Sequence, residues 1–276
     1  MKIINCNVCN YENNQEKKNQ ISIICKNCHV MTNLTATEFN YYKSGGQDIP
    51  SNKKKIERKK NSEARFEIIK KHIFSKNLFI DIGCGSGEML EVSKDYFNSS
   101  LGYEHDVDLF KYSLSENLNV INGDLQREHL NDFKLSKDDE ILLTLSHVIE
   151  HTKDPINLLK NIFEKISFKK LIYLEVPLYT GFSFQSKGYQ SSLWYDQHLN
   201  LYNQKTFKYF AKQLNLRIIE NGYRNFYADK FQKKNLIKAF FKKPFSSMIS
   251  LITKKKSNSL ADVLFKDYGY IIARKN

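Results

Sequence analysis

The sequence Phe79-Ile80-Asp81-Ile82-Gly83-Cys84-Gly85-Ser86-Gly87 has the pattern of a buried strand that turns sharply into a helix. An apolar run ends in the carboxylate of Asp81, and three glycines spaced two apart follow it. Glycine has no Cβ, so the chain can turn tightly and bring its backbone close to a ligand. We therefore predict a binding site for a small charged ligand at this turn. The helix expected after the turn has the apolar positions Met89, Leu90, Val92, Tyr96 and Phe97.

Length and composition indicate a globular protein with one sizeable core and room for a small appendage. The chain has 276 residues, of which 41% are hydrophobic and 26% are charged. No apolar run reaches the roughly 20 residues that span a bilayer. Residues 1–6 also lack the apolar part of a signal peptide. We therefore expect a cytoplasmic location.

The chain is strongly basic, with a formal net charge of +13 and a pI near 9.3. Such a charge is compatible with binding to nucleic acid or to an anionic membrane. The alternative is a lysine- and asparagine-rich surface that is only solvated. Charge alone therefore does not choose the partner.

Four of the five cysteines form two close pairs, Cys6-x-x-Cys9 and Cys25-x-x-Cys28. Two such pairs at this separation are typical of a zinc ribbon, in which four thiolates surround one metal ion. The alternatives are two disulfides, which a reducing cytosol disfavours, and a redox-active pair. A segment this small cannot build its own core, so zinc would stabilise its fold. We predict a zinc ribbon over residues 1–34, structural because four thiolates leave no open position on the metal.

Beyond the glycine turn, strand-like and helix-like segments alternate, which is typical of an α/β fold with a mostly parallel sheet. Ligands bind at the carboxyl ends of parallel strands, so the polar residues at those ends should lie near one another. They are Asp81, Glu104, Asp124 and Ser146. The further strands are expected at residues 101–104, 120–124, 140–146, 171–176 (stopped by Pro177), 216–219 and 268–273, and helices at residues 155–166 and 205–214.

Three segments resemble class I S-adenosylmethionine-dependent methyltransferases. Residues 81–87 are similar to their first motif, Ser146-His147-Val148-Ile149-Glu150-His151 to the segment after their fourth strand, and residues 268–275 to their closing strand. The resemblance implies a Rossmann-like α/β sandwich with a seven-stranded, mostly parallel sheet over residues 76–276. An N-terminal four-cysteine ribbon on such a core resembles sugar methyltransferases of polysaccharide and deoxysugar pathways, including C-methyltransferases.

The resemblance also implies how the donor, S-adenosylmethionine, is bound. The residues so assigned are Asp81, Gly83, Gly85 and Gly87 for its methionyl end, Glu104 for its ribose hydroxyls, and Asp124 and Leu125 for its adenine, with Ser146 beside them. A nicotinamide site is the alternative, but it requires the spacing Gly-x-Gly-x-x-Gly, which this loop lacks.

The acceptor side is expected to contain a general base. Methyl transfer to a hydroxyl or a carbon acid requires removal of a proton, and histidine is suited to this near pH 7. The segment Trp194-Tyr195-Asp196-Gln197-His198 resembles the segment that carries the base of sugar C-methyltransferases, although an amide replaces the usual glutamate. The resemblance implies His198 as the base, with Tyr195 beside it. His147 and His151 are the next candidates, and a structural role is the alternative for all three histidines.

Three further segments extend this division of the chain. Residues 35–75 are expected to form a basic helical linker, whose cationic run at residues 53–60 either contacts substrate phosphates or is solvated. Residues 178–203 are expected to cover the acceptor. Residues 230–259 combine apolar residues with lysine clusters, so they form either a lid or a peripheral membrane contact.

Two functions fit these features. The first is O- or C-methylation of a nucleotide-linked sugar or a surface-glycan precursor. The second is RNA methylation with the ribbon as an RNA-docking module, since some RNA methyltransferases combine a ribbon with this core and the chain is basic. Residues 146–149 lack the Asn/Asp-Pro-Pro-aromatic motif of many enzymes that methylate base amino groups, which favours the first function.

Overall fold

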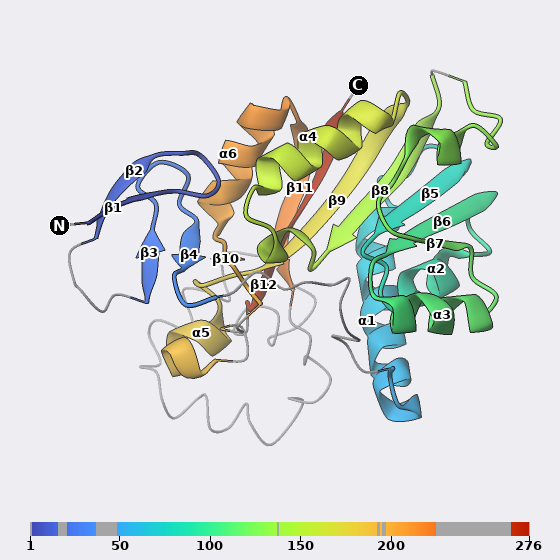
Figure 1. Ribbon diagram of the computed structural model, residues 1–276. Coiled ribbons are helices and arrows are strands. Elements are labelled where there is room, and N and C mark those ends of the chain that lie inside the picture. Colours follow the sequence, from blue (N-terminus) through green and yellow to red (C-terminus); the bar gives the residue numbers. More distant parts are fainter. Residues whose placement is uncertain are drawn as a thin grey trace, which may run out of the picture.

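The computed structural model describes residues 2–15, 21–36, 49–136, 138–191, 194, 197–224 and 266–275. These residues form a central sheet of seven strands in the order β11-β12-β9-β8-β5-β6-β7 (Figure 1). Strand β12 runs antiparallel to both of its neighbours, and the other pairs are parallel. The strand bounds are β5 Leu78–Ile82, β6 Ser99–Glu104, β7 Val120–Asn122, β8 Glu140–Ser146, β9 Lys169–Pro177, β11 Arg217–Arg224 and β12 Tyr268–Lys275.

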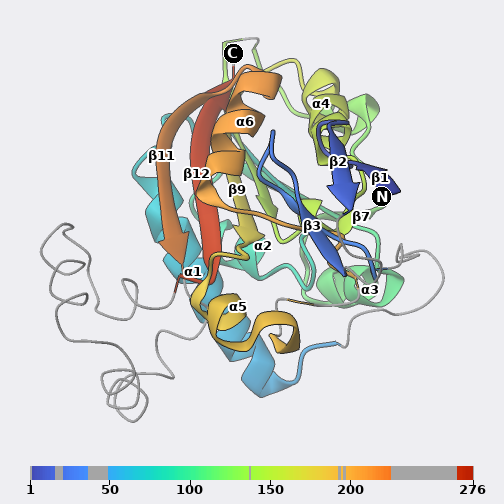
Figure 2. The ribbon, with the colours of Figure 1, turned by 90° about the vertical axis from the view of Figure 1, so that its left-hand side faces the viewer.

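The central strands have continuous apolar sequences because helices cover both faces of the sheet. In β5, Leu78 and Ile80 pack into one apolar core and Phe79 into another. Helices α4 and α6 cover the first face, and α1 and α2 cover the second (Figures 1 and 2). The helix bounds are α1 Asn52–Lys70, α2 Glu88–Ser93, α3 Val107–Ser115, α4 Pro155–Lys165, α5 Phe182–Lys187 and α6 Gln204–Leu214, with 3-10 turns η1 Arg127–Leu130, η2 Ile149–His151 and η3 Gly188–Gln190.

The strand order places a ligand crevice at the middle of this sheet. From β5 the chain adds β6 and β7 on one side, and it then crosses back to add β8 and β9 on the other. In open α/β sheets, ligands bind at the carboxyl ends of the strands where the order reverses in this way. The predicted fold class, a Rossmann-like α/β sandwich with a seven-stranded, mostly parallel sheet, is therefore confirmed.

Several predicted boundaries were wrong by a few residues, such as the end of β7, and two of them have a local reason. The helix after the glycine turn ends at Ser93, because the hydroxyl of Ser93 bonds back to the carbonyl of Met89 (2.8 Å) and competes with the helical pattern. Strand β9 includes Pro177, which was expected to stop it. As the last residue of the strand Pro177 needs no N–H donor, and its carbonyl accepts from the N–H of Tyr202 (3.2 Å).

The N-terminal segment is attached to the main domain by backbone pairing. Strands β1 Lys2–Asn5 and β2 Glu12–Gln15 form one hairpin, and β3 Ser22–Ile24 and β4 Met31–Asn33 form another. Strand β4 also pairs with β10 Asn200–Leu201, so the second hairpin extends into a three-stranded sheet. Figure 1 shows these hairpins beside α6, and their buried cysteines belong to the apolar core on that face of the sheet.

Two predicted features lie outside the described residues, namely the segment 230–259 and Tyr195. In the parts of the chain that the structure describes, none of the helices has the length and apolar character needed to cross a membrane.

Candidate active site

The glycine turn between β5 and α2 has a backbone conformation that favours glycine. Gly83, Gly85 and Gly87 have positive φ angles of 68°, 59° and 83°, a region that costs other residues about 1–2 kcal/mol. At Gly83 a Cβ atom would also lie 2.7 Å from the Cγ2 of Val148. The N–H of Gly83 donates to the carbonyl of Tyr103 in β6 (2.8 Å). The turn is thus fixed on the sheet, directly beside the segment that follows β8.

Glu104, the last residue of β6, faces this turn. Its Oε2 accepts a hydrogen bond from the N–H of Gly85 (2.7 Å), and its Oε1 accepts one from the N–H of Asp106 (2.8 Å). Burial raises the pKa of Glu104, although the backbone hydrogen bonds oppose this effect. The residue predicted to bind the ribose hydroxyls therefore lies against the glycine turn.

Asp81 is the buried carboxylate of β5, and its side chain points to β8. It is 4% exposed and accepts a hydrogen bond of 2.5 Å from the hydroxyl of Thr144. Burial raises the pKa of Asp81 to about 7, although this hydrogen bond lowers it. Ser146 is half-buried at the end of β8. Asp81 can therefore hold a proton or a cationic ligand near neutral pH.

The two residues predicted for the adenine occupy different environments. Asp124 follows β7 with a side chain that is 59% exposed, and its Oδ1 accepts from the Nε2 of His105 (2.9 Å). This hydrogen bond lowers the pKa of Asp124 and raises that of His105. Leu125 is buried in the apolar core. Of these two residues, only Asp124 presents an exposed polar group.

The basic stretch at residues 53–60 forms the first half of α1 and contacts the glycine turn. Arg58 donates to the hydroxyl of Ser86 (2.8 Å). Lys59 pairs with Glu91 of α2, and Lys55 pairs with Glu116 at the end of α3, each at 2.6 Å. Part of the cationic run is therefore neutralised by acidic residues around the donor side.

A buried ionic network at the end of β9 was not predicted from the sequence. Glu175 is fully buried and accepts from Arg65 of α1 (2.7 Å), Arg224 of β11 (2.8 Å) and the hydroxyl of Tyr173 (2.5 Å). Burial by itself would raise the pKa of Glu175, but the two guanidinium groups hold it well below its usual range. The available signal was a carboxylate inside an apolar strand, because a buried charge requires a partner.

His147 lies between this network and the segment after β8. Its Nε2 is 3.1 Å from Oε1 of Glu175, and its Nδ1 is 3.2 Å from Oε1 of Glu150. Its backbone has a positive φ of 59°. Burial alone lowers the pKa of His147, but the two carboxylates outweigh this effect and raise it. The two carboxylates therefore favour the protonated form of His147 and hold its ring between them.

Glu150, His151 and His198 form a second cluster on the acceptor side. One potential ligand atom from each of the three side chains lies within 4.8 Å of the others. The rings of His151 and His198 meet edge to face, with their centroids 4.9 Å apart. The Nδ1–H of His151 donates to the carbonyl of Gln197 (3.0 Å). The structure thus brings together two of the three histidines predicted from the sequence, although they are 47 positions apart.

The N-terminal hairpins help to fix this cluster through the segment that carries His198. The hydroxyl of Tyr202 donates to the carbonyl of Ile149 (2.9 Å), and the amide of Asn200 donates to the carbonyl of Thr152 (2.8 Å). On the opposite edge of the same segment, β10 pairs with β4. Backbone pairing and two side-chain hydrogen bonds therefore connect the cysteine-bearing module to the segment after β8.

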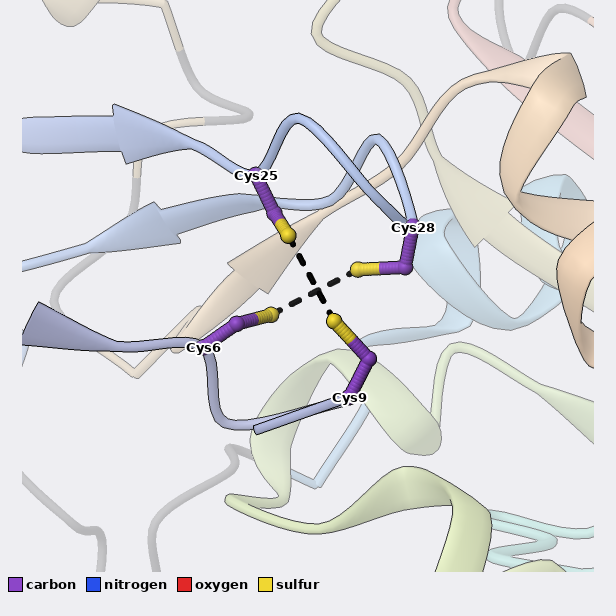
Figure 3. Close-up of side chains that lie close together, drawn as sticks. All are labelled: Cys6, Cys9, Cys25 and Cys28. Atoms are coloured by element: carbon purple, nitrogen blue, oxygen red, sulfur yellow. Dashed lines mark hydrogen bonds between the residues drawn. The ribbon is translucent and has the colours of Figure 1, made fainter. Parts of the chain in front are cut away.

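The four N-terminal cysteines converge on one point (Figure 3). The Sγ atoms of Cys6 and Cys28 are 3.4 Å apart, as are those of Cys9 and Cys25. All four thiols are free, so the alternative of two disulfides is wrong. In a tetrahedral zinc site with Zn–S bonds of about 2.3 Å, the sulfur atoms lie about 3.8 Å apart. The four thiols fit such a site with small adjustments.

The sheet order, the antiparallel β12 and the glycine turn at the reversal point together define a methyltransferase of the Rossmann-like class. Residues 54–221 match the family model described as a methyltransferase domain. The match covers more than half of the chain, and the protein belongs to this family. The prediction that the chain is a methyltransferase is therefore confirmed.

Solved structures show the same fold at low sequence identity. A SAM-dependent methyltransferase from Archaeoglobus fulgidus is 22% identical, with a TM-score of 0.52, covering 79% of this chain and 94% of its own. The plantazolicin methyltransferase BpumL, solved with a monoazolic desmethylPZN analogue and SAH, is 17% identical (TM-score 0.47; 82% and 86% coverage). Coclaurine N-methyltransferase is 14% identical (TM-score 0.45; 85% and 75% coverage). The search of curated proteins returned no match.

Proposed function

We propose that this methyltransferase transfers the methyl group of S-adenosylmethionine to a nucleotide-linked sugar or a surface-glycan precursor. The observation that carries the donor half is the carboxylate of Glu104 beside the N–H of Gly85. The donor combines an amine, a carboxylate, a ribose diol and a purine. Asp81 suits the amine, and Glu104 suits the diol. Asp124 is left for the purine amine.

The donor assignment is tested by the binding of SAH, measured by calorimetry. Loss of the carboxylate in Glu104→Ala should weaken binding by about 10- to 100-fold, because a hydrogen bond to a charged group contributes about 1.5–3 kcal/mol. Asp132→Asn, an exposed acid away from the turn, is the matched control and should bind as wild type does. Wild-type affinity in Glu104→Ala would show that the ribose assignment is wrong.

The acceptor assignment is supported by the cluster of His151 and His198 after β8 and by the resemblance of the segment around His198 to sugar C-methyltransferases. In the transfer, a lone pair or carbanion of the acceptor forms the bond to the methyl carbon while the bond from sulfur to methyl breaks. An acceptor hydroxyl or carbon acid also loses a proton. The sequence favours His198 for this step, with Tyr195 beside it and His151 and His147 as the next candidates.

The acceptor is tested by incubating the enzyme and labelled donor with a pool of nucleotide sugars and, separately, with RNA. We expect label in the sugar pool and none in RNA. Label in RNA, together with RNA that co-purifies and is released by salt, would favour the alternative function of an RNA methyltransferase.

We also propose that the four-cysteine module holds one structural zinc ion. Cys6, Cys9, Cys25 and Cys28 supply a donor set that zinc prefers, and a reducing compartment such as the cytoplasm would keep them as thiols. Metal analysis should find one zinc per chain bound by this module. Replacement of all four cysteines by serine should remove it, and retention of zinc would contradict the assignment.

A further inference from the structure

We propose that Glu150, His151 and His198 form a binding site for a divalent transition-metal ion on the acceptor side. The proposal concerns a second metal site, separate from the four cysteines, and it deepens the proposed function by assigning a role to the acceptor-side histidines. Binding of the ion can be tested by itself, whereas its role in turnover depends on the proposed function.

The three side chains are a donor set that metal ions use. Two imidazoles and one carboxylate bind catalytic zinc in some hydrolases and iron(II) in some oxygenases, with open coordination positions for water or substrate. Here one donor atom of each residue lies within 4.8 Å of the others. Around an ion with bonds of about 2.1 Å, such atoms lie roughly 3–3.5 Å apart, which small side-chain rotations would achieve.

The neighbours of these residues already have the arrangement of an outer ligand shell. A metal-bound histidine commonly donates its other ring N–H to a backbone carbonyl or a carboxylate, which orients the ring. His151 does this, since its Nδ1–H donates to the carbonyl of Gln197, and Nε2 is the ring nitrogen that would bind the metal. Glu150 is oriented in the same way, because its Oε1 is 3.2 Å from the Nδ1 of His147.

The second, independent observation is an unsatisfied oxygen. Glu150 is fully buried, and its Oε2 has no hydrogen-bond partner among the described residues. A buried carboxylate oxygen without a partner is costly, and a bound cation would satisfy it. As a carboxylate, Glu150 can supply the negative charge that balances a cation.

The donor set selects the class of ion and of acceptor. The two imidazoles suit Zn²⁺, Fe²⁺ or Ni²⁺, and the carboxylate and the open positions also suit Mn²⁺. With three protein ligands, the ion would retain open positions for a hydroxyl and an adjacent oxygen of the acceptor. This favours O-methylation of a sugar that presents vicinal oxygens, and it agrees with the amide Gln197 at the place of the glutamate usual in C-methyltransferases.

A bound cation would change how the acceptor loses its proton. A metal ion lowers the pKa of an oxygen ligand, so the hydroxyl proton would pass to solvent water. The oxygen lone pair then forms the bond to the methyl carbon, and the electron pair of the sulfur–methyl bond stays on sulfur. In the metal-bound enzyme His198 would be a metal ligand and would take up no proton. This role is therefore distinct from that of the general base, which the sequence favours for His198.

The proposal is tested with Mn²⁺, whose free-ion paramagnetic resonance signal is lost on binding. The full chain is used with its cysteine site zinc-loaded, because Mn²⁺ competes poorly for four thiolates. We expect one Mn²⁺ per chain. Outer-shell changes alone weaken metal sites by about 10- to 100-fold, so His198→Ala and His151→Ala should weaken binding by at least about 100-fold. His72→Ala, a histidine paired with Glu220 elsewhere in the fold, is the control and should bind normally.

The outcomes separate this proposal from the proposed function. SAH binding in each variant reports that the fold and the donor side are intact. If wild type binds no Mn²⁺, or if His198→Ala binds it equally well, the metal site is wrong. Methyl transfer to a sugar that persists after chelation without loss of zinc would then identify His198 as the base. Histidine-dependent Mn²⁺ binding without transfer to any nucleotide sugar would support the site and contradict the acceptor.

Discussion

The donor side and the acceptor side that we propose for this enzyme are neighbours, but they are built in different ways. The donor side consists of one continuous stretch, residues 79–87, and the carboxylates at nearby strand ends. The acceptor side combines residues 147–151, residues 197–202 and β4 of the N-terminal module, which distant parts of the chain supply. Local geometry thus fixes the first side and long-range contacts fix the second. The two sides should therefore respond differently to the same kind of change.

The largest effect is expected from Cys28→Ser. Cys28 is fully buried in the core beside α6, so loss of the proposed zinc site should cost more than about 4 kcal/mol of unfolding free energy. Through the pairing of β4 with β10, this change should abolish methyl transfer while SAH still binds the remaining fold. Zinc content, thermal unfolding and calorimetry measure these effects. Lys26→Ala in the same turn is the control. Methyl transfer by a zinc-free protein would show that the acceptor side does not depend on the N-terminal module.

The next largest effect is expected from Glu175→Gln. Without the carboxylate, Arg65 and Arg224 are buried charges with no counter-ion, which costs about 3–5 kcal/mol. Because the pKa of Glu175 is depressed in the folded state, its contribution to stability is complete above its unfolded value of about 4.3. That contribution is lost as the pH falls through the lower, folded value. Denaturant unfolding between acid and neutral pH measures both effects.

Strand β9 supplies a matched control for this prediction. Lys169, at the other end of the strand, pairs with Asp138, whose side chain is 92% exposed. Asp138→Asn should cost less than about 1 kcal/mol because water screens exposed ion pairs. Equal losses for the two variants would show that burial of the Glu175 network does not determine its contribution.

On the donor side, two glycines separate backbone strain from steric contact. Both positions have positive φ, but a Cβ at Gly83 would clash with Val148 at 2.7 Å, whereas at Gly85 nothing lies within 4 Å. Gly85→Ala should cost about 1–2 kcal/mol of strain. Gly83→Ala should cost more and weaken SAH binding by about tenfold or more. Calorimetry on both variants tests this order, and equal affinities would show that contact with Val148 is unimportant.

A smaller effect, in pH dependence, is expected from Asp81. Its pKa is raised to about 7 by burial, so without donor its contribution to stability is present at low pH and is lost as the pH rises through that value. The ionised form suits the donor's cationic amine, so donor affinity should rise with pH up to about 7 and then level off. Calorimetry from pH 5 to 9 measures this curve. Asp81→Asn should flatten it, and an unchanged curve would assign the titration to another group.

The sequence predicted the donor side more fully than the acceptor side, and the reason is physical. The glycine spacing needs only local information, because positive φ at Gly83, Gly85 and Gly87 is a property of each residue. The strands were predicted because parallel strands buried on both faces leave long apolar runs. The pairing of His151 with His198 depends on tertiary contacts, which no local pattern records. The ionic network of Glu175 was missed for the same reason, since its arginines come from α1 and β11.

The smallest effect tests whether the N-terminal module reaches the acceptor side through single contacts as well. The hydroxyl of Ser22 in β3 lies 2.8 Å from that of Tyr189, whose ring packs edge to face on Trp194 at 4.7 Å. A neutral hydrogen bond contributes about 0.5–1.5 kcal/mol. Ser22→Ala and Tyr189→Phe should therefore each raise the acceptor KM by up to about tenfold, leave SAH binding unchanged, and shift the emission of Trp194, the one tryptophan of the chain.

If the two hydroxyls act through their mutual bond, the double variant should be no worse than either single one. Tyr11→Phe, an exposed tyrosine in the other hairpin region, is the control for loss of a hydroxyl. Additive effects of the two substitutions on the acceptor KM would mean that the hydrogen bond between the two hydroxyls is not what connects the module to the acceptor segment. An equal change in SAH affinity would mean that the donor and acceptor sides are not separable. Loss of a contact made only on the acceptor side would then have changed donor binding at the glycine turn.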